Sequence, residues 1–384
     1  MPLTRKIFDD THQSIREAFR TFVEREVSPH HERWEMAGRV DKTMFRAAGV
    51  AGFLGMAAPS EFGGGDASDF RLNAVIAEEI QRAGVGGSGM CITLHNNVCL
   101  PYLLGAGTPE QLARWLPGVC SGETMLALAM TEPSAGSDLG AMATVAVRNG
   151  DHYVVNGAKT FISSALNCDT IILAVKTDAS KRHHGISLLV VDASSEGLSR
   201  GKPFAKIGLK SQDTSELFFD NVSVPVANLL GAEGSGFQQL VEKLPQERLG
   251  IAIASVAASK RAFDLTLEYC RERRAFNQPI GSFQSNRFTL AELRTEIDLA
   301  QVFVDRQIEA HIEGELTAED AAEAKWWCTE LQQRVVAAGV QLHGGSGFMA
   351  DTSIARAFLD ARVQTIYGGT TQIMKEIIGR SLGI

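Results

Sequence analysis

The sequence predicts an α+β protein in which a helical region, a β region and a second helical region follow one another. Three observations predict this order: apolar residues at helical spacing in the first third, short β-branched segments between about 125 and 230, and longer helical segments after Gly236. We therefore expect domains at residues 1–122, 123–232 and 233–384, packed into one subunit.

Composition and charge are those of an ordinary globular protein. Hydrophobic residues make up 45% and the net charge is −8, which argues against a nucleic-acid surface or an anionic membrane as partner. No stretch approaches the roughly 20 apolar residues of a membrane span, and the first residues lack the apolar core of a signal peptide. The six cysteines include no CxxC pair, so we expect neither disulfides nor a thiolate metal site. These features favour a cytoplasmic protein.

Four segments of the first region are predicted to be helices, because their apolar residues recur at helical spacing. They are Ser14–Val27, Asp41–Ala48, Phe70–Ala83 and Pro109–Leu116. The last of them has Thr108 as a suitable N-cap and proline at its first position.

Several short motifs carry no prediction of function. Gly84–Gly89 matches the dinucleotide-binding GxGxxG pattern, but it follows a helical segment and not a strand, so we interpret it as an interhelical loop. The pairs His30-His31 and His183-His184 lack metal-site spacing and are interpreted as surface residues. His343 is interpreted as a core histidine with its hydrogen bonds satisfied.

The middle region is predicted to contain strands at Thr170–Lys176, Ile186–Asp192 and Glu216–Val224. Asn149-Gly150 and Asn156-Gly157 are typical of hairpin turns in which both turn residues adopt positive φ.

The last region is predicted to contain helices at Pro245–Arg274, Ser285–Glu313 and Ala318–Gly339, and a final helix beginning near Gly369-Thr370. An acid two residues after a helix-starting proline, as at Glu247, is common because the helix dipole favours it. Taken alone, Glu247 therefore has an ordinary structural explanation.

Five blocks of sequence, in conserved order and spacing, resemble the motifs of the acyl-CoA dehydrogenase family. Ala127–Gly140 contains TEPSAGSD, which differs from the family's usual TEPGAGSD only at Ser134. In the third block Asn277 stands where the family usually has glycine. The other blocks are Asn156–Ser164 (NGAKTFISS), Arg271–Ala291 (RERRAFNQPIGSFQSNRFTLA), Gln341–Phe348 (QLHGGSGF) and Ile366–Arg380 (IYGGTTQIMKEIIGR).

The resemblance implies the family's fold: an N-terminal α-helical domain, a middle β-barrel-like domain and a C-terminal four-helix bundle. It also implies a homotetramer, built as a dimer of dimers, with FAD bound between the β domain and the C-terminal helices. The residues implied to contact the flavin ring or its surroundings are Leu128, Met130, Thr131, Ser137, Phe161, Ile162 and Ser163.

The rest of the implied FAD site involves a neighbouring subunit. Arg273, Phe276 and Gln284 are implied to reach across a dimer interface to the adenosine diphosphate. Gln341 and Gly345 are implied to border the same diphosphate. Thr370 and Gln372 are implied to follow it at a helix N-terminus, where free N–H groups favour anions.

The resemblance also singles out a catalytic base. Many family members carry a glutamate in a C-terminal IYEGT, but this chain has Gly368 at that position. A minority, including the long-chain and isovaleryl types, carry the base on the helix that opens the last domain, where this chain has LPQERL. Glu247 is therefore implied to be the base, Arg248 to steady it, and the Gly368 N–H to bind the thioester carbonyl. Ser137 and Gly369 complete the implied substrate contacts.

The implied activity is α,β-dehydrogenation of a long-chain acyl-CoA in fatty-acid β-oxidation, with electrons passed to an electron-transferring flavoprotein. Alternatives are an isovaleryl-type dehydrogenase for branched short chains, and a catalytically silent flavoprotein that binds acyl-CoA. An acyl-CoA oxidase is disfavoured because the chain lacks the length for an extra helical domain.

Overall fold

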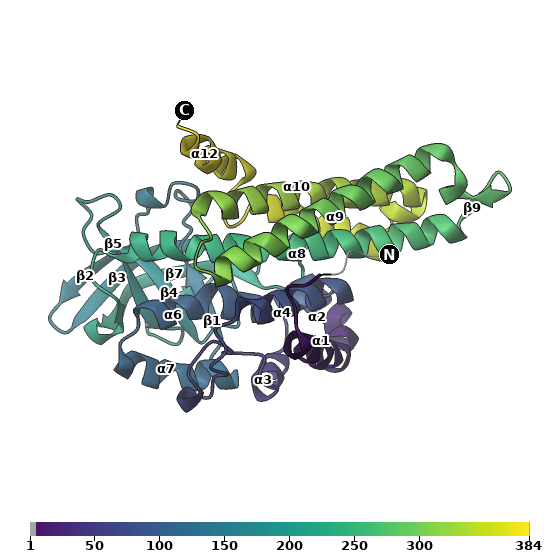
Figure 1. Cartoon of the computed structure of the whole chain (residues 1–384). Coiled ribbons are helices and arrows are strands. Elements are labelled where there is room, and N and C mark those ends of the chain that lie inside the picture. Colours follow the sequence, from purple (N-terminus) through teal and green to yellow (C-terminus); the bar gives the residue numbers. More distant parts are fainter. Residues whose placement is uncertain (1–4, 384) are drawn as a thin grey trace.

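A computed structural model describes residues 5–383 and shows three regions in the expected order (Figure 1). Helices α1–α7 precede a β sheet, and long helices α8–α10 form the C-terminal region together with the shorter α11 and α12. No helix among these residues combines the length and apolar character needed to cross a membrane.

The N-terminal helices follow from amphipathic segments with clear capping residues. Thr108 caps α7 through a reciprocal capping box with Gln111, and Pro109 occupies its first position, as predicted. The helices are α1 (Asp10–Phe22), α2 (His31–Ala37), α3 (Lys42–Val50), α4 (Phe70–Ala83), α5 (Gly86–Thr93), α6 (Leu100–Ala106) and α7 (Pro109–Ser121). Short π-helical stretches at Val23–Val27 and Leu94–Cys99 extend α1 and join α5 to α6.

The middle region is one eight-stranded sheet with strand order β6-β7-β3-β2-β4-β5-β8, and β1 pairs with β4 in parallel. All other neighbours pair antiparallel except the short contact of β2 with β4. The strands are β1 (Leu126–Ala129), β2 (Val145–Asn149), β3 (His152–Ser163), β4 (Thr170–Lys176), β5 (Ile186–Asp192), β6 (Leu198–Arg200), β7 (Thr214–Pro225) and β8 (Leu229–Leu230).

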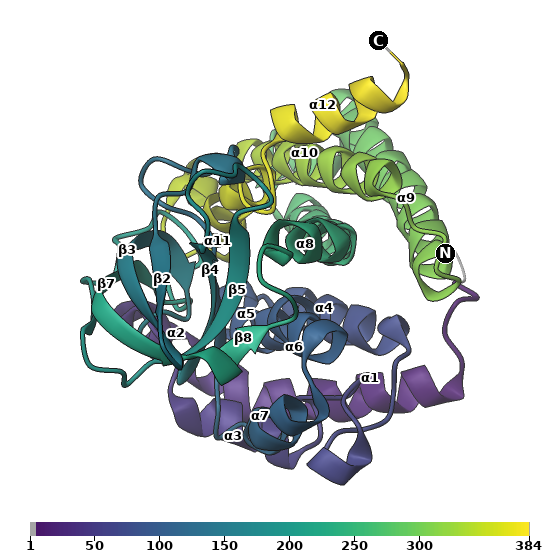
Figure 2. The ribbon, with the colours of Figure 1, turned by 90° about the vertical axis from the view of Figure 1, so that its left-hand side faces the viewer.

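Helix α8 (Gly236–Glu272) is the central element of the molecule. It has 37 residues and packs against α10 (Ala318–His343), α9 (Gln284–Ile312) and α4. Figure 2 shows it with the sheet on one side, α4–α6 below and α9 and α10 above. Helices α11 (Ser353–Ala361) and α12 (Thr371–Ser381) pack against α10.

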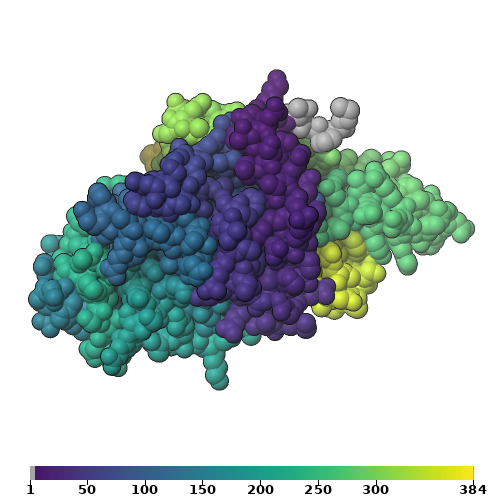
Figure 3. All heavy atoms as spheres, turned by 90° about the horizontal axis from the view of Figure 1, so that it is seen from below, coloured from purple at the N-terminus to yellow at the C-terminus, as the bar shows by residue number. Residues whose placement is uncertain are grey.

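The far end of the C-terminal helices extends beyond the other two regions. A small hairpin, β9 (Arg274–Ala275) and β10 (Gln278–Pro279), forms its tip (Figure 1). In Figure 3 the N-terminal helices and the sheet form one broad surface, and the green end of the long helices projects past it.

The two Asn-Gly pairs behave differently from the prediction. The first forms the expected hairpin, but Gly150 and Asp151 are its turn residues and only Gly150 has positive φ. The second, Asn156-Gly157, lies inside β3 at a bulge against β7, so the predicted turn is wrong. Gly157 is required there because a Cβ atom would lie 2.7 Å from Thr144 Cα.

Three further predictions need correction. Helix α8 begins at Gly236 and not at Pro245, which lies inside the helix; Ser235, its N-cap, makes no side-chain cap. The glycine string Gly84–Gly89 is the C-cap of α4 and the first turn of α5, and not a loop. His31 is buried and hydrogen-bonded to Ser88 Oγ at 2.8 Å, and is not a surface residue.

Candidate active site

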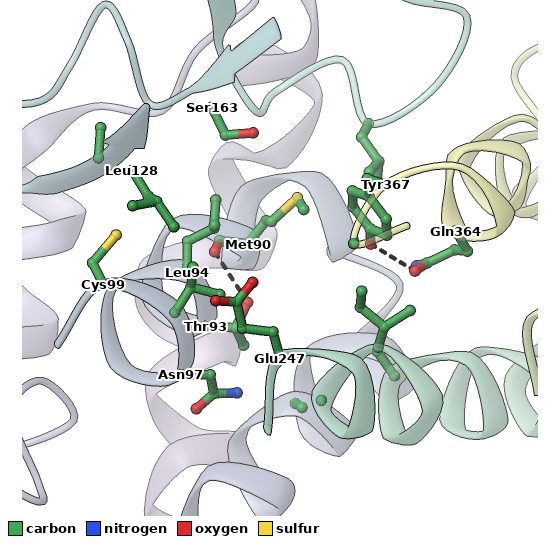
Figure 4. Close-up of a pocket in the computed structure, with 18 of the residues that line it drawn as sticks. Met90, Thr93, Leu94, Asn97, Cys99, Leu128, Ser163, Glu247, Gln364 and Tyr367 are labelled. Carbon is green, nitrogen blue, oxygen red and sulfur yellow. Dashed lines mark hydrogen bonds between the residues drawn. The ribbon is translucent and has the colours of Figure 1, made fainter. Parts of the chain in front are cut away.

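A cavity of about 230 Å³ lies between α8, the α4–α5 region, β1, β3 and the turn before α12 (Figure 4). Glu247 and Gly368 both line it, although they are far apart in sequence. The sheet side of its wall contains six residues predicted from the flavin motifs: Leu128, Met130, Thr131, Phe161, Ile162 and Ser163.

Glu247 presents a buried carboxylate to this cavity. Only 8% of the residue is exposed, and burial raises the pKa of its carboxyl to about 7 although Tyr102 and Arg248 oppose the shift. Because α8 begins at Gly236, Glu247 lies about three turns into the helix. The helix-dipole explanation for an acid at this position therefore does not apply.

Tyr102, on α6, holds the carboxylate in place. Its hydroxyl donates a hydrogen bond of 2.8 Å to Glu247 Oε1, and the tyrosine is fully buried. This contact could not be predicted, because the two residues are 145 positions apart and no motif includes Tyr102.

Two buried cations hold the Gly368-Gly369 turn. Arg248 Nε donates to the Gly368 carbonyl at 3.2 Å, and Lys325 Nζ donates to the Gly369 carbonyl at 2.6 Å. Burial, together with neighbouring Arg248, lowers the pKa of Lys325 to about 8. Both glycines have positive φ, at +64° and +99°, and the Gly368 N–H donates to no backbone carbonyl of residues 5–383. The turn thus presents a free N–H beside the cavity.

The two motif strands are locked together by a buried ion pair that sequence reasoning missed. Lys159 Nζ lies 2.7 Å from Glu132 Oε1, and both side chains are almost fully buried. The lysine also donates to the Met130 carbonyl, while Glu132 accepts from the N–H groups of Ala143 and Thr144. This pair joins TEPSAGSD to NGAKTF, and fixes the wall made by β1 and β3.

Phe161 marks the open side of this wall. It is 66% exposed with φ of +57°, and its ring contacts Phe204. Figure 4 shows Leu128 and Ser163 on the sheet side and Glu247 on the α8 side of the cavity. Ser137, by contrast, is exposed and does not line the cavity.

The other predicted cofactor residues lie elsewhere. Arg273, Phe276 and Gln284 are exposed at the far end of the bundle, about 38 Å along α8 from Glu247. Gln341 and Gly345 flank the end of α10 at this same end, where Tyr269 on α8 donates to the His343 carbonyl at 3.1 Å. The His343 ring stacks on Tyr269, and its Nδ1 atom forms a hydrogen bond with the Gly339 carbonyl, which agrees with the predicted structural role. Thr370 caps α12, and Gln372 is exposed in its first turn.

The far part of the cavity is apolar and was not predicted. It lies between α4, α5 and the Gly250–Ala254 stretch of α8. The side chains that line this part are Ala77, Ile80, Met90, Thr93, Leu94 and Ile251. Helical periodicity could have placed them on the inner faces of their helices, but it could not show that they surround a common cavity.

Comparison with known proteins identifies the family. The models of the N-terminal, middle and C-terminal domains of acyl-CoA dehydrogenase match residues 9–123, 127–222 and 234–383. The chain belongs to the acyl-CoA dehydrogenase family. Members of this family are FAD-dependent oxidoreductases that act on acyl-CoA.

Individual relatives match along nearly the whole chain. The long-chain specific acyl-CoA dehydrogenase of Rattus norvegicus mitochondria is 42% identical over 98% of this chain and 88% of its own. The crystal structure of an acyl-CoA dehydrogenase from Geobacillus kaustophilus is 46% identical, with a TM-score of 0.97, over 99% and 100% of the two chains. A chain from a structure describing the electron transferring flavoprotein of Acidaminococcus fermentans is 32% identical, with a TM-score of 0.93, over 99% of each of the two chains.

The cavity fits a flavin ring on structural grounds. The β1–β3 wall offers apolar side chains, the hydroxyls of Thr131 and Ser163 and, at its open edge, the exposed ring of Phe161. Within residues 5–383 neither hydroxyl is used in a hydrogen bond, so both are free to bind polar ring atoms. Glu247 faces this wall across the cavity, which leaves a substrate between the two.

Proposed function

We propose that this protein oxidises a long-chain acyl-CoA to the trans-2-enoyl-CoA, with Glu247 abstracting the α-proton. The observation that carries the proposal is a carboxylate with a pKa of about 7, buried in a cavity and opposite the flavin wall. A general base works best when its pKa lies near the working pH, because it is then both ionised and basic.

The surrounding groups support proton abstraction. Tyr102 donates to one carboxylate oxygen, which leaves the other free for the substrate. The proposed donor to the thioester carbonyl is the Gly368 N–H, where it would stabilise the negative charge that develops as the proton leaves. FAD, when bound, supplies the acceptor for the hydride from the β-carbon. Arg248 and Lys325 keep the Gly368-Gly369 turn in the required position through its two carbonyls.

Two further observations favour a long acyl chain. The apolar end of the cavity runs from Glu247 toward Ala77 and Ile80 on α4. The 42% identity with a long-chain specific dehydrogenase supports the same substrate class.

The electron acceptor and assembly form part of this proposal. The likeness to a chain from a structure of electron transferring flavoprotein supports such a protein as the acceptor. The exposed Arg273, Phe276 and Gln284, far from Glu247, are proposed to bind the FAD of a neighbouring subunit in a dimer of dimers.

The test is anaerobic addition of acyl-CoA thioesters of increasing length to the FAD-loaded protein, followed by flavin absorbance. We expect bleaching that is fastest with long straight chains. A maximum with isovaleryl-CoA would support the branched short-chain alternative. A flavin that stays oxidised with every chain would support a silent acyl-CoA-binding protein and overturn the proposal.

The base is tested with Glu247→Gln, and the control is Glu242→Gln on the same helix. Glu242 is exposed and bonds only to Gln238 among the described residues. Glu247→Gln should keep FAD and acyl-CoA binding while flavin reduction falls about 10³-fold or more, since no other carboxylate of residues 5–383 lines the cavity. Near-normal reduction in this variant would rule out Glu247.

A further inference from the structure

A second, small cavity of about 40 Å³ lies beyond the apolar end of the first. It is enclosed by the α4–α5 turn, α8, α10 and α11. Gln81 and Gly86 line both cavities, so the two are neighbours with a shared wall. The Gln81 side chain makes no hydrogen bond within residues 5–383 and is free to turn aside. Apart from Gln81, this end of the first cavity has mainly apolar side chains, whereas polar side chains predominate in the second.

One face of α8 lines both cavities. Glu247, Gly250 and Ala254 border the first, and Ala258 and Arg261 border the second, at the three- and four-residue spacing of a helix face. Ala258 and Arg261 follow Glu247 by 11 and 14 residues, or about 16 to 21 Å along the helix. An extended alkyl chain covers this distance with roughly 13 to 17 carbon–carbon bonds, at about 1.25 Å per bond along its axis.

Arg261 is a cation without an anionic partner in the described part of the chain. Its guanidinium donates to the Arg82 carbonyl at 2.8 Å, and no carboxylate of residues 5–383 forms an ion pair with it. It lies against Gly84, where an added Cβ would come within 2.4 Å of Arg261 Nη2. Burial and the nearby Arg356 and Arg82 lower its pKa, so its charge is poorly compensated.

A second polar group in the cavity lacks a partner. Gln332, on α10, is 3% exposed, and its Oε1 atom has no hydrogen-bond partner in the described structure. Buried amides without a partner are uncommon, and each costs about 1–3 kcal/mol unless a ligand or water satisfies it. The amide group can also rotate and offer its NH₂ to an acceptor.

Two further charged groups line the cavity, Arg356 and Asp360. Arg356 Nε lies 3.1 Å from Glu35 Oε2, so this cation already has an anionic partner. Asp360 accepts a hydrogen bond from the Leu209 N–H, and burial raises the pKa of its carboxyl to about 6, which favours the neutral form. Arg261 is thus the cation lining this cavity that has no carboxylate partner within residues 5–383.

We propose that the cavity at Arg261 binds the terminal carboxylate of a long acyl chain, so that the substrates include mono-CoA thioesters of long α,ω-dicarboxylic acids. This inference rests on the proposed function, because the thioester end must lie at Glu247. The carboxylate binds Arg261 through its guanidinium and Gln332 through its amide NH₂. The distance from Glu247 to Arg261 sets the chain length at which the carboxylate and the thioester can both be bound.

The test compares flavin reduction by hexadecanedioyl-CoA, palmitoyl-CoA and hexanedioyl-CoA in the wild type and in Arg261→Gln. In the variant, kcat/KM for hexadecanedioyl-CoA should fall about 10- to 100-fold, as for loss of a hydrogen bond to a charged group. Palmitoyl-CoA reaches the same place with a methyl group that forms no hydrogen bond with Arg261, so its kcat/KM should change by no more than about twofold. Hexanedioyl-CoA, whose carboxylate cannot reach Arg261, should respond as palmitoyl-CoA does.

Arg82→Gln is the matched control, since Arg82 lies beside Arg261 but pairs with Glu79 and does not line the cavity. Arg261→Lys keeps the positive charge and should retain part of the preference for hexadecanedioyl-CoA over palmitoyl-CoA. This result would show that the loss in Arg261→Gln does not come from a folding defect. An equal loss with both sixteen-carbon substrates, or no loss with either, would overturn the inference. Failure of palmitoyl-CoA to reduce the wild-type flavin would instead overturn the proposed function.

Discussion

The Tyr102 hydroxyl donates a 2.8 Å hydrogen bond to Glu247 Oε1, and this contact joins the N-terminal helices to the helix that carries the proposed base. Both side chains are buried, so the hydrogen bond forms without competition from solvent. It favours the ionised carboxylate and opposes part of the increase in pKa caused by burial.

Tyr102→Phe should therefore raise the pKa of Glu247. We expect the rate of flavin reduction in the wild type to rise with pH and to level off above about 7, and the midpoint to move to higher pH in the variant. Stopped-flow measurement of flavin reduction across a pH series gives both the plateau rate and the midpoint. Tyr153→Phe is the control, because Tyr153 makes the same kind of hydrogen bond to Glu233 away from the cavity. An unchanged midpoint in Tyr102→Phe would exclude the positioning role.

Burial of Glu247 also links stability to pH. Its folded pKa of about 7 lies above the ordinary glutamate pKa of 4.5, so the folded state binds the proton more tightly than the unfolded chain does. The resulting stabilisation is complete below pH 4.5 and is lost as pH rises through 7, to a limit of roughly 3 kcal/mol. Glu247→Gln should remove this loss, and its melting temperature relative to wild type should increase between pH 5 and pH 8. A melting-temperature difference between the two proteins that stays the same from pH 5 to pH 8 would contradict ionisation of Glu247 in its buried position.

Moving the carboxylate to the other side of the cavity should restore some activity. Glu247→Gln combined with Gly368→Glu is expected to reduce flavin faster than Glu247→Gln alone, because both positions line one cavity. The recovery should be partial, since Gly368 has φ of +64° and an added Cβ would lie 2.6 Å from Ile251 Cδ1. Ile251→Val removes that methyl group and should improve the double variant. No recovery in either would indicate that the two positions do not face the same carbon.

FAD retention should depend on the far end of the bundle. Arg273→Ala is expected to lower the FAD-to-protein ratio after dilution, since the residue cannot reach the flavin wall of its own chain. The control is Arg274→Ala, whose side chain bonds locally to the Asn277 carbonyl. Gel filtration with absorbance at flavin and protein wavelengths gives the ratio. Equal FAD content in the two variants would contradict a role for Arg273 in a neighbouring site.

The order of the three regions, most helices and three long strands could be predicted because they depend on local patterns. Strands β4 and β5 match their predicted limits, and α4 begins and ends where its periodicity indicated. The start of α8 could not be predicted, because Ser235 gives no side-chain cap and Pro245 looks like a helix start. Asn156-Gly157 has the composition of a turn, yet pairing with β7 makes it part of a strand.

The site was predictable only where a motif carried it. Glu247 and Gly368 could be singled out because the motif resemblance implied that the base stands at one of these two positions, and the structure brings both to one cavity. Tyr102 and Lys325 could not, because each acts through a partner that only folding brings near. Gln332 could not either, because only folding places it in the second cavity. The Glu132–Lys159 pair lay within two recognised motifs, but opposite charges in separate blocks do not reveal a buried contact.

The uninterrupted run of α8 past Pro245 limits which changes in chain length the protein can accept. Each residue inserted into the helix turns everything beyond it by about 100°. One extra residue between Glu247 and Ala254 would therefore turn the base away from the face that lines the cavity. An extra residue in the β9–β10 turn, Phe276-Asn277, would leave that alignment untouched. Insertions and deletions along the central helix should accordingly abolish proton abstraction, whereas one at the tip of the bundle should leave the base aligned and affect only the proposed FAD contacts of the neighbouring subunit.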